Sequence, residues 1–507
     1  MEYLLGVDMG TLGTKAVLFD LLGNMVTSSY FPHREPYTPN PAISEQDADD
    51  WWRAVQLSVK EVFKRGISPQ EIVGIGLSTQ GGGLVCVDEG GKTLIPVMTY
   101  ADRRTMAERV ELQELLNKKI PEVMKGRGTP NSLAQILWVR KHQPAVEKAA
   151  VKFMTSRGYL GYKLTDVVAF DDYGSRGFGG DFDSMKWIPD ILDVAGVSEE
   201  KLGKIYRSWE IFGNVSKTAE EETGLKEGTP VCTGVWDGMC NIVGSGLTRQ
   251  GMVMDITGTT EICTVLAKGP GKTWYKDAGP YLPPLGKGLY YWYSSPRPTG
   301  NILHWFKEFA SGETEASDKL GLSVYQLMDL EAEKVGAGSN RLIVFPHFQG
   351  VTYGGCTPDY NTRGFFIGVT LAHRRGHFIR AIMESVAYTL RHIFDVYEED
   401  GASLDEVRVS GGGAKSELWN QIKADVTGRR MALIHCVETS ALGAVMLASV
   451  GLKVHKDFED AANNMVRIAK RYEPNKVNYE RYNKLYEVYW EAYNQLKGPF
   501  AKLAAIQ

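Results

Sequence analysis

Two segments of the chain share one pattern: an apolar strand, an acid, a Gly-Thr turn and a second apolar strand. The first is residues 6–20, GVDMGTLGTKAVLFD, with Asp8 before the turn and Gly10-Thr11 in it. The second is residues 251–267, GMVMDITGTTEICTVLA, with Asp255 and Gly258-Thr259 in the matching places. Each segment predicts a tight hairpin of two strands. In a chain of 507 residues the recurrence indicates two α/β domains that begin alike, which we place at residues 1–247 and 248–507.

Composition and charge narrow the classes of partner. The net charge is −4 and the basic residues are scattered, so a nucleic-acid or membrane-surface partner is not expected. No apolar run approaches the roughly 20 residues that cross a bilayer, and the first residues lack the pattern of a signal peptide. The six cysteines show neither C-x-x-C nor zinc-finger spacing. We therefore expect a cytoplasmic protein whose cysteines are reduced.

The two Gly-Thr hairpins have the residues that a phosphate site needs. Glycines let a ligand approach the backbone, and successive N–H groups form a nest for an anion. The Asp8 carboxylate beside such a site makes sense if Mg²⁺ or a metal-bound water lies between it and the phosphate. The alternative is a structural turn built from turn-favouring residues. The candidates for phosphate contact are Gly10, Thr11, Gly13 and Thr14 in the first hairpin and Gly258 and Thr259 in the second.

Two further motifs join a strand to a helix. Residues 410–428, SGGGAKSELWNQIKADVTG, place three glycines where a ligand can lie against the helix N-terminus. The spacing is neither a Walker P-loop nor G-x-G-x-x-G, and a structural turn is the alternative. Asp237 follows a strand at 231–234, so it can face a cleft and accept a proton from a hydroxyl. Its alternative role is the N-cap of the helix that follows.

Two segments between these motifs are rich in polar residues. Residues 78–104 run from STQGGG to ADRR, where Gln80, Asp102 and Arg103 can hydrogen-bond a polyhydroxy ligand. The alternative there is a hairpin followed by a surface charge cluster. Residues 171–186, DDYGSRGFGGDFDSMK, are predicted to form an exposed loop.

Taken in order, the motifs resemble the FGGY family of carbohydrate kinases, within the actin, hexokinase and Hsp70 superfamily. DMGTLGTKA, ADRR, GVWDGMCNIVGSG and TGTTE are similar to the first phosphate motif, the W-N/Q-D-x-R segment, the catalytic-base segment and the second phosphate motif of the family. Residues 363–391 are similar to the family signature, and residues 409–431 to its adenosine motif, with ETSALGAVMLASVG as the usual sequel. The resemblance runs nearly end to end, from Leu5 to Gly451.

The resemblance implies an α/β fold with two actin-like (ribonuclease H-like) domains and a nucleotide cleft between them. It implies ATP-dependent phosphorylation of a sugar or polyol hydroxyl, with ATP and Mg²⁺ as cofactors and Asp237 as the general base. Asp8 would act through the metal, and Lys15 can contact a phosphate but need not. Family members are often dimers, so a homodimer is compatible with the resemblance. The remaining implied contacts are Gly300, His304, Gly411, Gly412, Gly413 and Ala414 for the nucleotide, and Gln80, Gly81, Gly82, Asp102 and Trp236 for the sugar.

The sequence departs from the family where the sugar would bind. Xylulose kinases read G-Q-M-H-G, and glycerol kinases Q-R-E-T, where this chain has TQGGG at residues 79–83. L-Xylulose-type kinases are closer, with small or polar residues after the glutamine and a similar D-R-R. The G-E-R-T-P segment is replaced by residues 349–353, QGVTY, and Trp236 is unexpected beside the base. We expect a ketopentose such as xylulose, with erythritol, glycerol, ribulose or fuculose as alternatives.

Three other classes of protein share single motifs with this chain. An Hsp70-like ATPase would need a peptide-binding domain after an adenosine motif that begins at residue 410, which leaves too little chain. A sugar-sensing regulator without catalysis is disfavoured because Asp8 and Asp237 are both present. A nicotinamide dehydrogenase is disfavoured because the glycine spacing is wrong and no acid is suitably placed at the end of a following strand.

Overall fold

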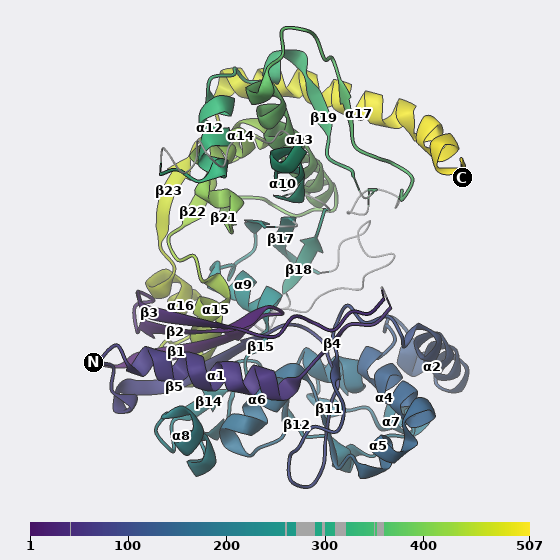
Figure 1. Cartoon of the computed structure of the whole chain (residues 1–507), viewed down its shortest axis with the longest axis vertical. Coiled ribbons are helices and arrows are strands. Elements are labelled where there is room, and N and C mark those ends of the chain that lie inside the picture. Colours follow the sequence, from purple (N-terminus) through teal and green to yellow (C-terminus); the bar gives the residue numbers. More distant parts are fainter. Residues whose placement is uncertain are drawn as a thin grey trace. The chain divides into compact units, whose positions relative to one another are not determined.

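The computed structural model describes residues 1–40, 42–258, 261–269, 289–296, 300–309, 321–348, 350–351 and 359–506 (Figure 1). They form two compact units. Unit 1 comprises Met1–Gly246 and Glu438–Val466, and unit 2 comprises Leu247–Val437 and Arg467–Gln507. Within the described residues, no helix is both long enough and apolar enough to span a membrane.

Unit 1 is built on an antiparallel meander that continues into parallel strands. The strand order is β13-β14-β5-β1-β2-β3, with the short β15 also paired to β5. Neighbours β3-β2 and β2-β1 are antiparallel, β1-β5 and β5-β14 are parallel, and β14-β13 is antiparallel. The strands are β1 (Tyr3–Met9), β2 (Gly13–Asp20), β3 (Met25–Pro32), β5 (Ile72–Thr79), β13 (Ile211–Asn214), β14 (Pro230–Cys232) and β15 (Val235–Trp236).

The sheet of unit 2 repeats this plan strand for strand. Its order is β18-β17-β16-β21-β22-β23, and the pairs are antiparallel, antiparallel, parallel, parallel and antiparallel. The two similar sequence segments thus occupy equivalent places, because β1-β2 and β16-β17 are the same hairpin of the plan. The strands are β16 (Met252–Thr257), β17 (Glu261–Lys268), β18 (Leu289–Ser294), β21 (Glu406–Ser410), β22 (Met431–Ile434) and β23 (Ile468–Tyr472).

The described residues of unit 1 include two large apolar cores. Helix α1 buries Trp51, Val55, Val59 and Val62 against the sheet, at the spacing of an amphipathic helix. A second core joins helices from the middle of the unit to the short β6-β8 and β9-β12 pairs. The bounds are α1 (Ala48–Phe63), α2 (Met106–Lys119), α3 (Pro121–Met124), α4 (Asn131–His142), α5 (Pro144–Ala149), α6 (Ser156–Thr165), α7 (Pro189–Ala195), α8 (Lys217–Thr223), α9 (Asp237–Gly244), β4 (Glu45–Gln46), β6 (Val85–Val87), β7 (Val97–Met98), β8 (Lys152–Met154), β9 (Ala169–Asp171), β10 (Gly180–Asp181), β11 (Lys186–Trp187) and β12 (Lys204–Tyr206).

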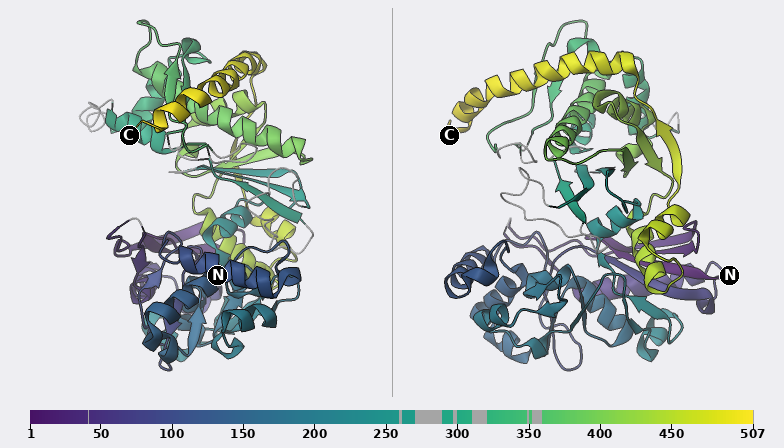
Figure 2. Two further views of the ribbon diagram at one scale, coloured as in Figure 1. Left: turned by 90° about the vertical axis from the view of Figure 1, so that its right-hand side faces the viewer. Right: turned by 180° about the vertical axis from the view of Figure 1, so that it is seen from behind.

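Unit 2 has one core around its longest buried helix, α13. Helix α17, drawn in yellow, runs beside α14, and near its C-terminal end Phe500 packs against Phe365 of β20 (Figure 2). Arg380 of α13 forms a buried ion pair with Glu384, whose carboxylate also accepts a hydrogen bond from the Tyr482 hydroxyl of α17. The bounds are α10 (Gly300–Phe309), α12 (Val324–Glu333), α13 (Arg375–Glu399), α14 (Glu417–Thr427), α17 (Lys476–Ala504), β19 (Ile343–Phe345) and β20 (Phe365–Ile367).

After residue 437 the chain returns to unit 1. The expected domains, residues 1–247 and 248–507, do not include this return. Helices α15 (Thr439–Gly451) and α16 (Phe458–Met465) then lie beside β1–β3 (Figures 1 and 2). Glycines make the approach of α15 possible. A Cβ on Gly443 would lie 1.8 Å from the Cys240 carbonyl oxygen, and one on Gly76 would lie 2.1 Å from the Ala444 oxygen. Helix α15 therefore packs closely against both α9 and the sheet of unit 1.

We predict that Gly443→Ala lowers the free energy of unfolding by about 3 kcal/mol. Alanine favours helix by about 1 kcal/mol over glycine, but the collision with the Cys240 carbonyl outweighs that gain. Urea unfolding followed by circular dichroism measures the change. Ser440→Ala, on the half-buried start of the same helix, is the control and should stay within about 0.5 kcal/mol of the parent. An unchanged Gly443→Ala protein would mean that α15 is not tightly packed.

Candidate functional site

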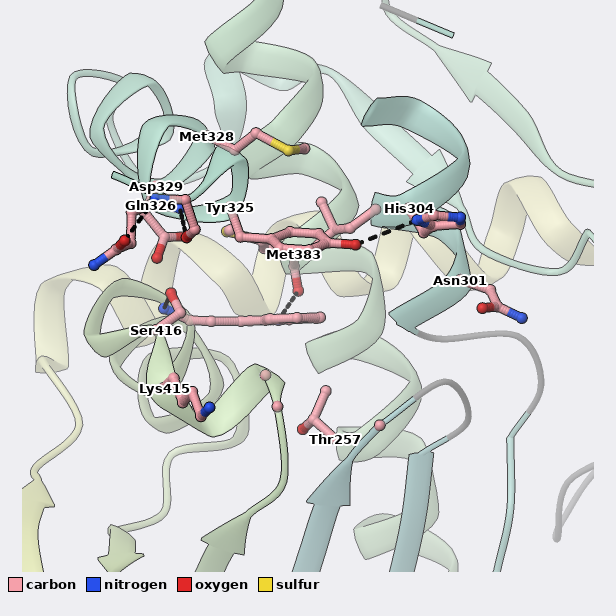
Figure 3. A pocket seen from close by; sticks show the side chains of 16 residues that line it. Thr257, Asn301, His304, Tyr325, Gln326, Met328, Asp329, Met383, Lys415 and Ser416 are labelled. Atoms are coloured by element: carbon pink, nitrogen blue, oxygen red, sulfur yellow. Dashed lines mark hydrogen bonds between the residues drawn. The ribbon is translucent and has the colours of Figure 1, made fainter. Parts of the chain in front are cut away.

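Unit 2 contains a pocket of about 830 Å³ beside the C-terminal ends of β16 and β21 (Figure 3). Its walls come from α10, α12, α13, α14 and the glycine loop after β21. Such a pocket, apolar with a few convergent polar groups, has the character of a small-molecule site. The lining residues are Thr257, Gly258, Asn301, Leu303, His304, Ser323, Tyr325, Gln326, Met328, Asp329, Met383, Gly412, Gly413, Lys415, Ser416 and Trp419.

The glycine loop after β21 forms part of the pocket wall, so a ligand in the pocket would lie against its backbone. Gly412 and Gly413 line the cavity, and Gly412 faces open space. Gly411 has a φ of +88° and its Cβ would lie 2.7 Å from the Thr257 carbonyl oxygen, so glycine is required where the loop passes β16. Ala414 is buried behind the loop, where its carbonyl accepts a hydrogen bond from Asn420.

Several lining residues were not predicted from the sequence. Tyr325 of α12 is 45% exposed, and its hydroxyl lies 3.4 Å from Nδ1 of His304 (Figure 3). Trp419 of α14 donates its indole N–H to the Met383 carbonyl. Burial raises the pKa of Asp329 to about 6, against the lowering effect of its Ser416 hydrogen bond. The helical pattern of these segments indicates which face is buried, but it carries no signal that distinguishes a pocket wall from the core.

Of the remaining residues predicted for unit 2, some lie at the pocket and others lie outside the described residues. His304 lines the pocket and Gly258 forms the start of the β16-β17 turn, while Gly300 is the first residue of α10. Thr259 lies outside the described residues, as do Gln349, Thr352 and Tyr353.

In unit 1, Asp8 lies near the end of β1 opposite Ser78 of β5. The Ser78 hydroxyl donates to Oδ1 of Asp8 at 2.6 Å. Burial raises the pKa of the Asp8 carboxyl, against the lowering effects of that hydrogen bond and of Lys15. Among the described residues no hydrogen bond to Oδ2 is formed, so that oxygen is the one that could take a cation or a metal-bound water.

The first hairpin turn has the expected shape, but two of its residues point elsewhere. The Gly10 N–H donates to the Gly13 carbonyl at 2.9 Å and closes the turn. Thr14 is fully buried, and its hydroxyl lies 2.8 Å from Nε2 of His33. Lys15 forms an ion pair with Glu438 at 2.5 Å. The hydroxyl of Thr14 is thus occupied in the core, and Lys15 has a carboxylate partner that a phosphate would have to displace.

A closed ring of hydrogen bonds joins the turn to the end of β5. The Thr11 hydroxyl donates to Oε1 of Gln80 at 3.1 Å, and the Gln80 amide donates to Oε1 of Gln46 at 2.7 Å. The Gln46 amide in turn donates to the Thr11 carbonyl at 2.7 Å. Gln80 is only 4% exposed, so both ends of its amide are used inside the protein. Gln46 was not singled out from the sequence, because a glutamine after a loop has no distinctive pattern.

Asp102, predicted as a sugar ligand, has partners within the protein. Its carboxylate accepts hydrogen bonds from Nε and Nη2 of Arg104 and from the Ser44 backbone N–H, and its side chain is 1% exposed. Arg104 also pairs with Glu45 at 2.6 Å. Asp102, Arg104 and Glu45 thus form a charge cluster that is largely buried. Arg103 is exposed.

Two of the three glycines after Gln80 are explained by the backbone. Gly82 and Gly83 have φ values of +75° and +84°, which disfavour any side chain. A Cβ on Gly83 would also lie 2.7 Å from the Ser156 hydroxyl oxygen. Gly81 has an ordinary φ, and its Cβ would lie 3.8 Å from Cβ of Trp236. The backbone conformation of the loop therefore requires glycine at positions 82 and 83.

Asp237 is the first residue of α9, directly after β15, and is half-buried. Its Oδ1 accepts the Gly238 N–H at 2.7 Å, so the carboxylate also serves the start of the helix. Burial raises the pKa of Asp237 to about 6, and the nearby charge of Asp8 adds to the rise. A carboxylate with this pKa is suited to accept a proton near neutral pH.

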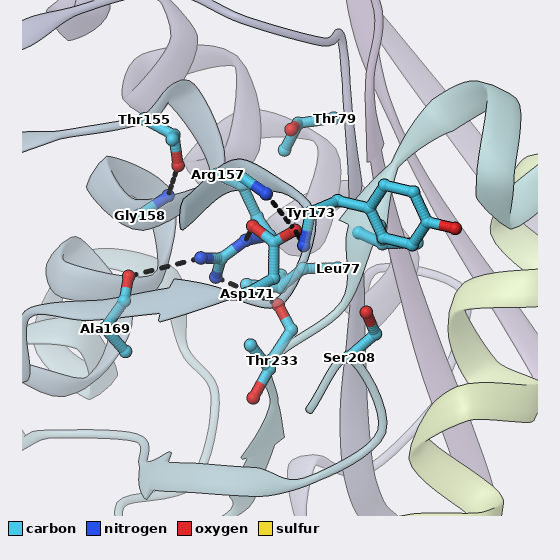
Figure 4. A network of polar contacts seen from close by, with 12 residues as sticks. Leu77, Thr79, Thr155, Arg157, Gly158, Ala169, Asp171, Tyr173, Ser208 and Thr233 are labelled. Atoms are coloured by element: carbon cyan, nitrogen blue, oxygen red, sulfur yellow. Dashed lines mark hydrogen bonds and ion pairs between the residues drawn. The ribbon is translucent and has the colours of Figure 1, made fainter. Parts of the chain in front are cut away.

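A buried polar network lies next to the segment that leads to Asp237 (Figure 4). Arg157 donates to Asp171 at 2.7 Å and to the carbonyls of Thr233 and Ala169 at 3.0 and 3.2 Å. Asp171 also accepts the Gly174 N–H at 2.7 Å. The prediction of an exposed loop at 171–186 is therefore wrong over its first half, because these carboxylates and N–H groups satisfy one another inside the unit.

Comparison with known proteins agrees with this geometry. The N-terminal domain model of the FGGY family of carbohydrate kinases matches residues 3–244, and the C-terminal domain model matches residues 256–452. The chain is 27% identical to the xylulose kinase of Bacillus subtilis over 504 residues, covering 98% of each protein. It is also 27% identical to the gluconokinase of that organism over 517 residues, covering 100% of this chain and 98% of the relative.

The fold is also that of a solved carbohydrate kinase. The crystal structure of xylulose kinase from Rhodospirillum rubrum matches with a TM-score of 0.82 at 27% identity, over 99% of this chain and 100% of the other. The predicted two-domain α/β fold class is confirmed. The chain belongs to the FGGY family of carbohydrate kinases and is a sugar kinase.

Proposed function

We propose that this kinase transfers the γ-phosphoryl group of ATP to a hydroxyl of a ketopentose, with xylulose as the first choice. Asp237 carries the catalytic part of the proposal, because its raised pKa and its place after a sheet strand suit a general base. The choice of a ketopentose rests on likeness to xylulose kinases in both sequence and fold.

Asp237 accepts the proton of the sugar hydroxyl while the sugar oxygen bonds to the γ-phosphorus and the bond to the ADP oxygen breaks. When bound, ATP supplies the phosphoryl group, and Mg²⁺ offsets the negative charge of the phosphates. Asp8 is the carboxylate of unit 1 that would hold the metal, through the oxygen that Ser78 leaves open. Gly412, Gly413 and the aromatic walls of the unit 2 pocket suit an adenosine. The protein otherwise acts mainly by positioning.

Trp236 and Gly81 are proposed to shape the sugar site. The indole lies over Gly238, since a Cβ there would be 2.0 Å from Cζ3 of Trp236, and it also flanks Gly81. Gly82, in the place of the xylulose kinase histidine, has a positive φ of +75° that disfavours a side chain, whereas Gly81, in the place of the methionine, is not restricted in this way. The Trp236 ring then supplies the apolar wall, and Gln80 is available only if its bonds to Thr11 and Gln46 rearrange.

A substrate panel tests the proposed function. ADP release with Mg-ATP should require added sugar, and D- or L-xylulose should give the largest kcat/KM among xylulose, ribulose, fuculose, erythritol, xylitol, glycerol and gluconate. Gluconate is included because a gluconokinase is as similar to this chain as a xylulose kinase. A strong response to gluconate or erythritol alone would reject the ketopentose and keep the kinase. No response to any sugar, despite ATP binding, would reject both.

Asp237→Asn should lose at least about 10³-fold of the sugar-dependent turnover, because the amide cannot accept the proton. The fold should remain, since the Asn oxygen can still accept the Gly238 N–H. The ionised carboxylate is disfavoured by burial, so its removal should raise the free energy of unfolding at pH 7 by roughly 1–3 kcal/mol. Coupled assays and thermal melts measure both changes. Asp193→Asn, at an exposed position of α7, is the matched control and should change neither.

The pH profile of kcat/KM for the sugar should bend near pH 6. Burial raises the pKa of Asp237 from 3.8 to about 6, so the carboxylate is increasingly protonated as the pH falls below that value. Turnover by a general base should then fall about tenfold per pH unit below the bend and level off above pH 7. Initial rates at saturating Mg-ATP between pH 5 and 8 give the profile. A flat profile over this range would contradict the role of Asp237 as the base.

A further inference from the structure

A fully buried lysine lies beneath the β16-β17 hairpin. The ammonium of Lys423, on α14, is 2.5 Å from Oδ2 of Asp255, 2.5 Å from the Thr257 hydroxyl and 2.8 Å from Oε1 of Glu261. The Lys423 side chain is 2% exposed, and both carboxylates are fully buried. Thr257 and Glu261 are paired across the hairpin, directly before and after the turn that begins with Gly258. The lysine therefore holds the two ends of this turn together.

Lys423 cannot itself be a phosphate ligand in this arrangement. An ammonium has three N–H donors, and three oxygens of the protein already accept from it. Burial and the neighbouring Asp255 raise the pKa of Glu261 well above its usual value, although Lys423 opposes the rise. A proton on Glu261 would give Oδ1 of Asp255 and Oε2 of Glu261 a partner, since the described residues offer them no other.

The same lysine connects the hairpin to the glycine loop of the pocket. Helix α14 begins at Glu417, directly after the loop that contains Gly412 and Gly413. A Cβ on Gly413 would lie 2.5 Å from Cγ2 of Thr257, so the loop and the hairpin are in direct contact. The Lys423 ammonium is also 5.4 Å from the ring centre of Trp419, which lines the pocket. One side chain thus fixes the distance between two walls of the pocket.

We propose that Lys423 is a positioning residue for the nucleotide. It keeps the turn that begins at Gly258, where phosphates would bind, at a fixed distance from the glycine loop, where the adenosine would bind. The proposal rests on the nucleotide site assigned above to this pocket. It predicts that loss of Lys423 weakens binding of a nucleotide that has phosphates and spares binding of the nucleoside. Only the nucleotide contacts both the turn and the glycine loop, so only its binding depends on the distance between them.

Calorimetric titration of the full chain with Mg-ADP and with adenosine tests this prediction. Lys423→Met should weaken Mg-ADP binding about tenfold and change adenosine binding by less than about twofold. The double variant Asp255→Asn/Lys423→Met removes a carboxylate together with the ammonium, so less buried charge is left without a partner, and it decides the question if the single variant does not fold. Arg380→Met is the matched control, since it breaks a buried ion pair of the same unit that does not line the pocket.

The outcomes separate positioning from general damage. The proposal is supported if the Lys423 variants lose Mg-ADP selectively, while Arg380→Met lowers the melting temperature but leaves both affinities within about twofold. It is overturned if a folded Lys423 variant binds Mg-ADP as the parent does, or if Mg-ADP and adenosine weaken equally. A parent protein that binds neither ligand would instead reject the nucleotide site, and the proposed function with it.

Discussion

In each unit, the candidate site depends on one parallel strand that pairs with the free edge of the first hairpin. This strand is β5 in unit 1 and β21 in unit 2. In unit 1 this pairing sets Asp8 opposite Ser78, and the pairing of β15 with β5 sets Trp236 opposite Thr79. In unit 2 it sets Ile256 opposite Ser410, so the Gly258 turn and the glycine loop leave the sheet side by side. Backbone hydrogen bonds fix these registers to the residue. Segments far apart in the sequence are thereby brought to one edge of each sheet, and the candidate site consists of what they carry.

The elements that follow from local pattern could be predicted from the sequence. The two hairpins, the amphipathic α1 and α13 and the position of Asp237 after a strand depend on spacing within a few residues. The return of residues 438–466 to unit 1 could not be predicted, because it depends on which surface accepts α15. That surface is defined by Gly6, Gly76 and Gly244, which allow carbonyl groups of α15 to approach. None of these glycines is marked in the sequence as the partner of a distant helix.

The partners of polar side chains were the least predictable part of the site. A sequence gives the hydrogen-bonding capacity of a residue, but the fold decides which neighbour uses it. Asp102 has the capacity to bind a sugar, yet Arg104 and Ser44 occupy its oxygens. Thr14 has the hydroxyl of a phosphate ligand, but it contacts His33 in the core. Conversely, Tyr325 belongs to an ordinary amphipathic helix and still lines the pocket, because the glycine loop opposite it leaves space.

The two Gly-Thr hairpins occupy equivalent places but are held by different forces. Neutral amide and hydroxyl groups hold the first, in the ring of Thr11, Gln80 and Gln46, where each bond contributes about 1 kcal/mol net. Buried charges hold the second, where removal of one partner costs about 3–5 kcal/mol. The first hairpin can therefore exchange partners at small cost when a ligand approaches Gln80, whereas the second keeps one geometry. Under the proposed function, this difference would suit an enzyme whose nucleotide is constant and whose sugar differs among relatives, because evolution could alter the weakly held contacts without disturbing the strongly held ones.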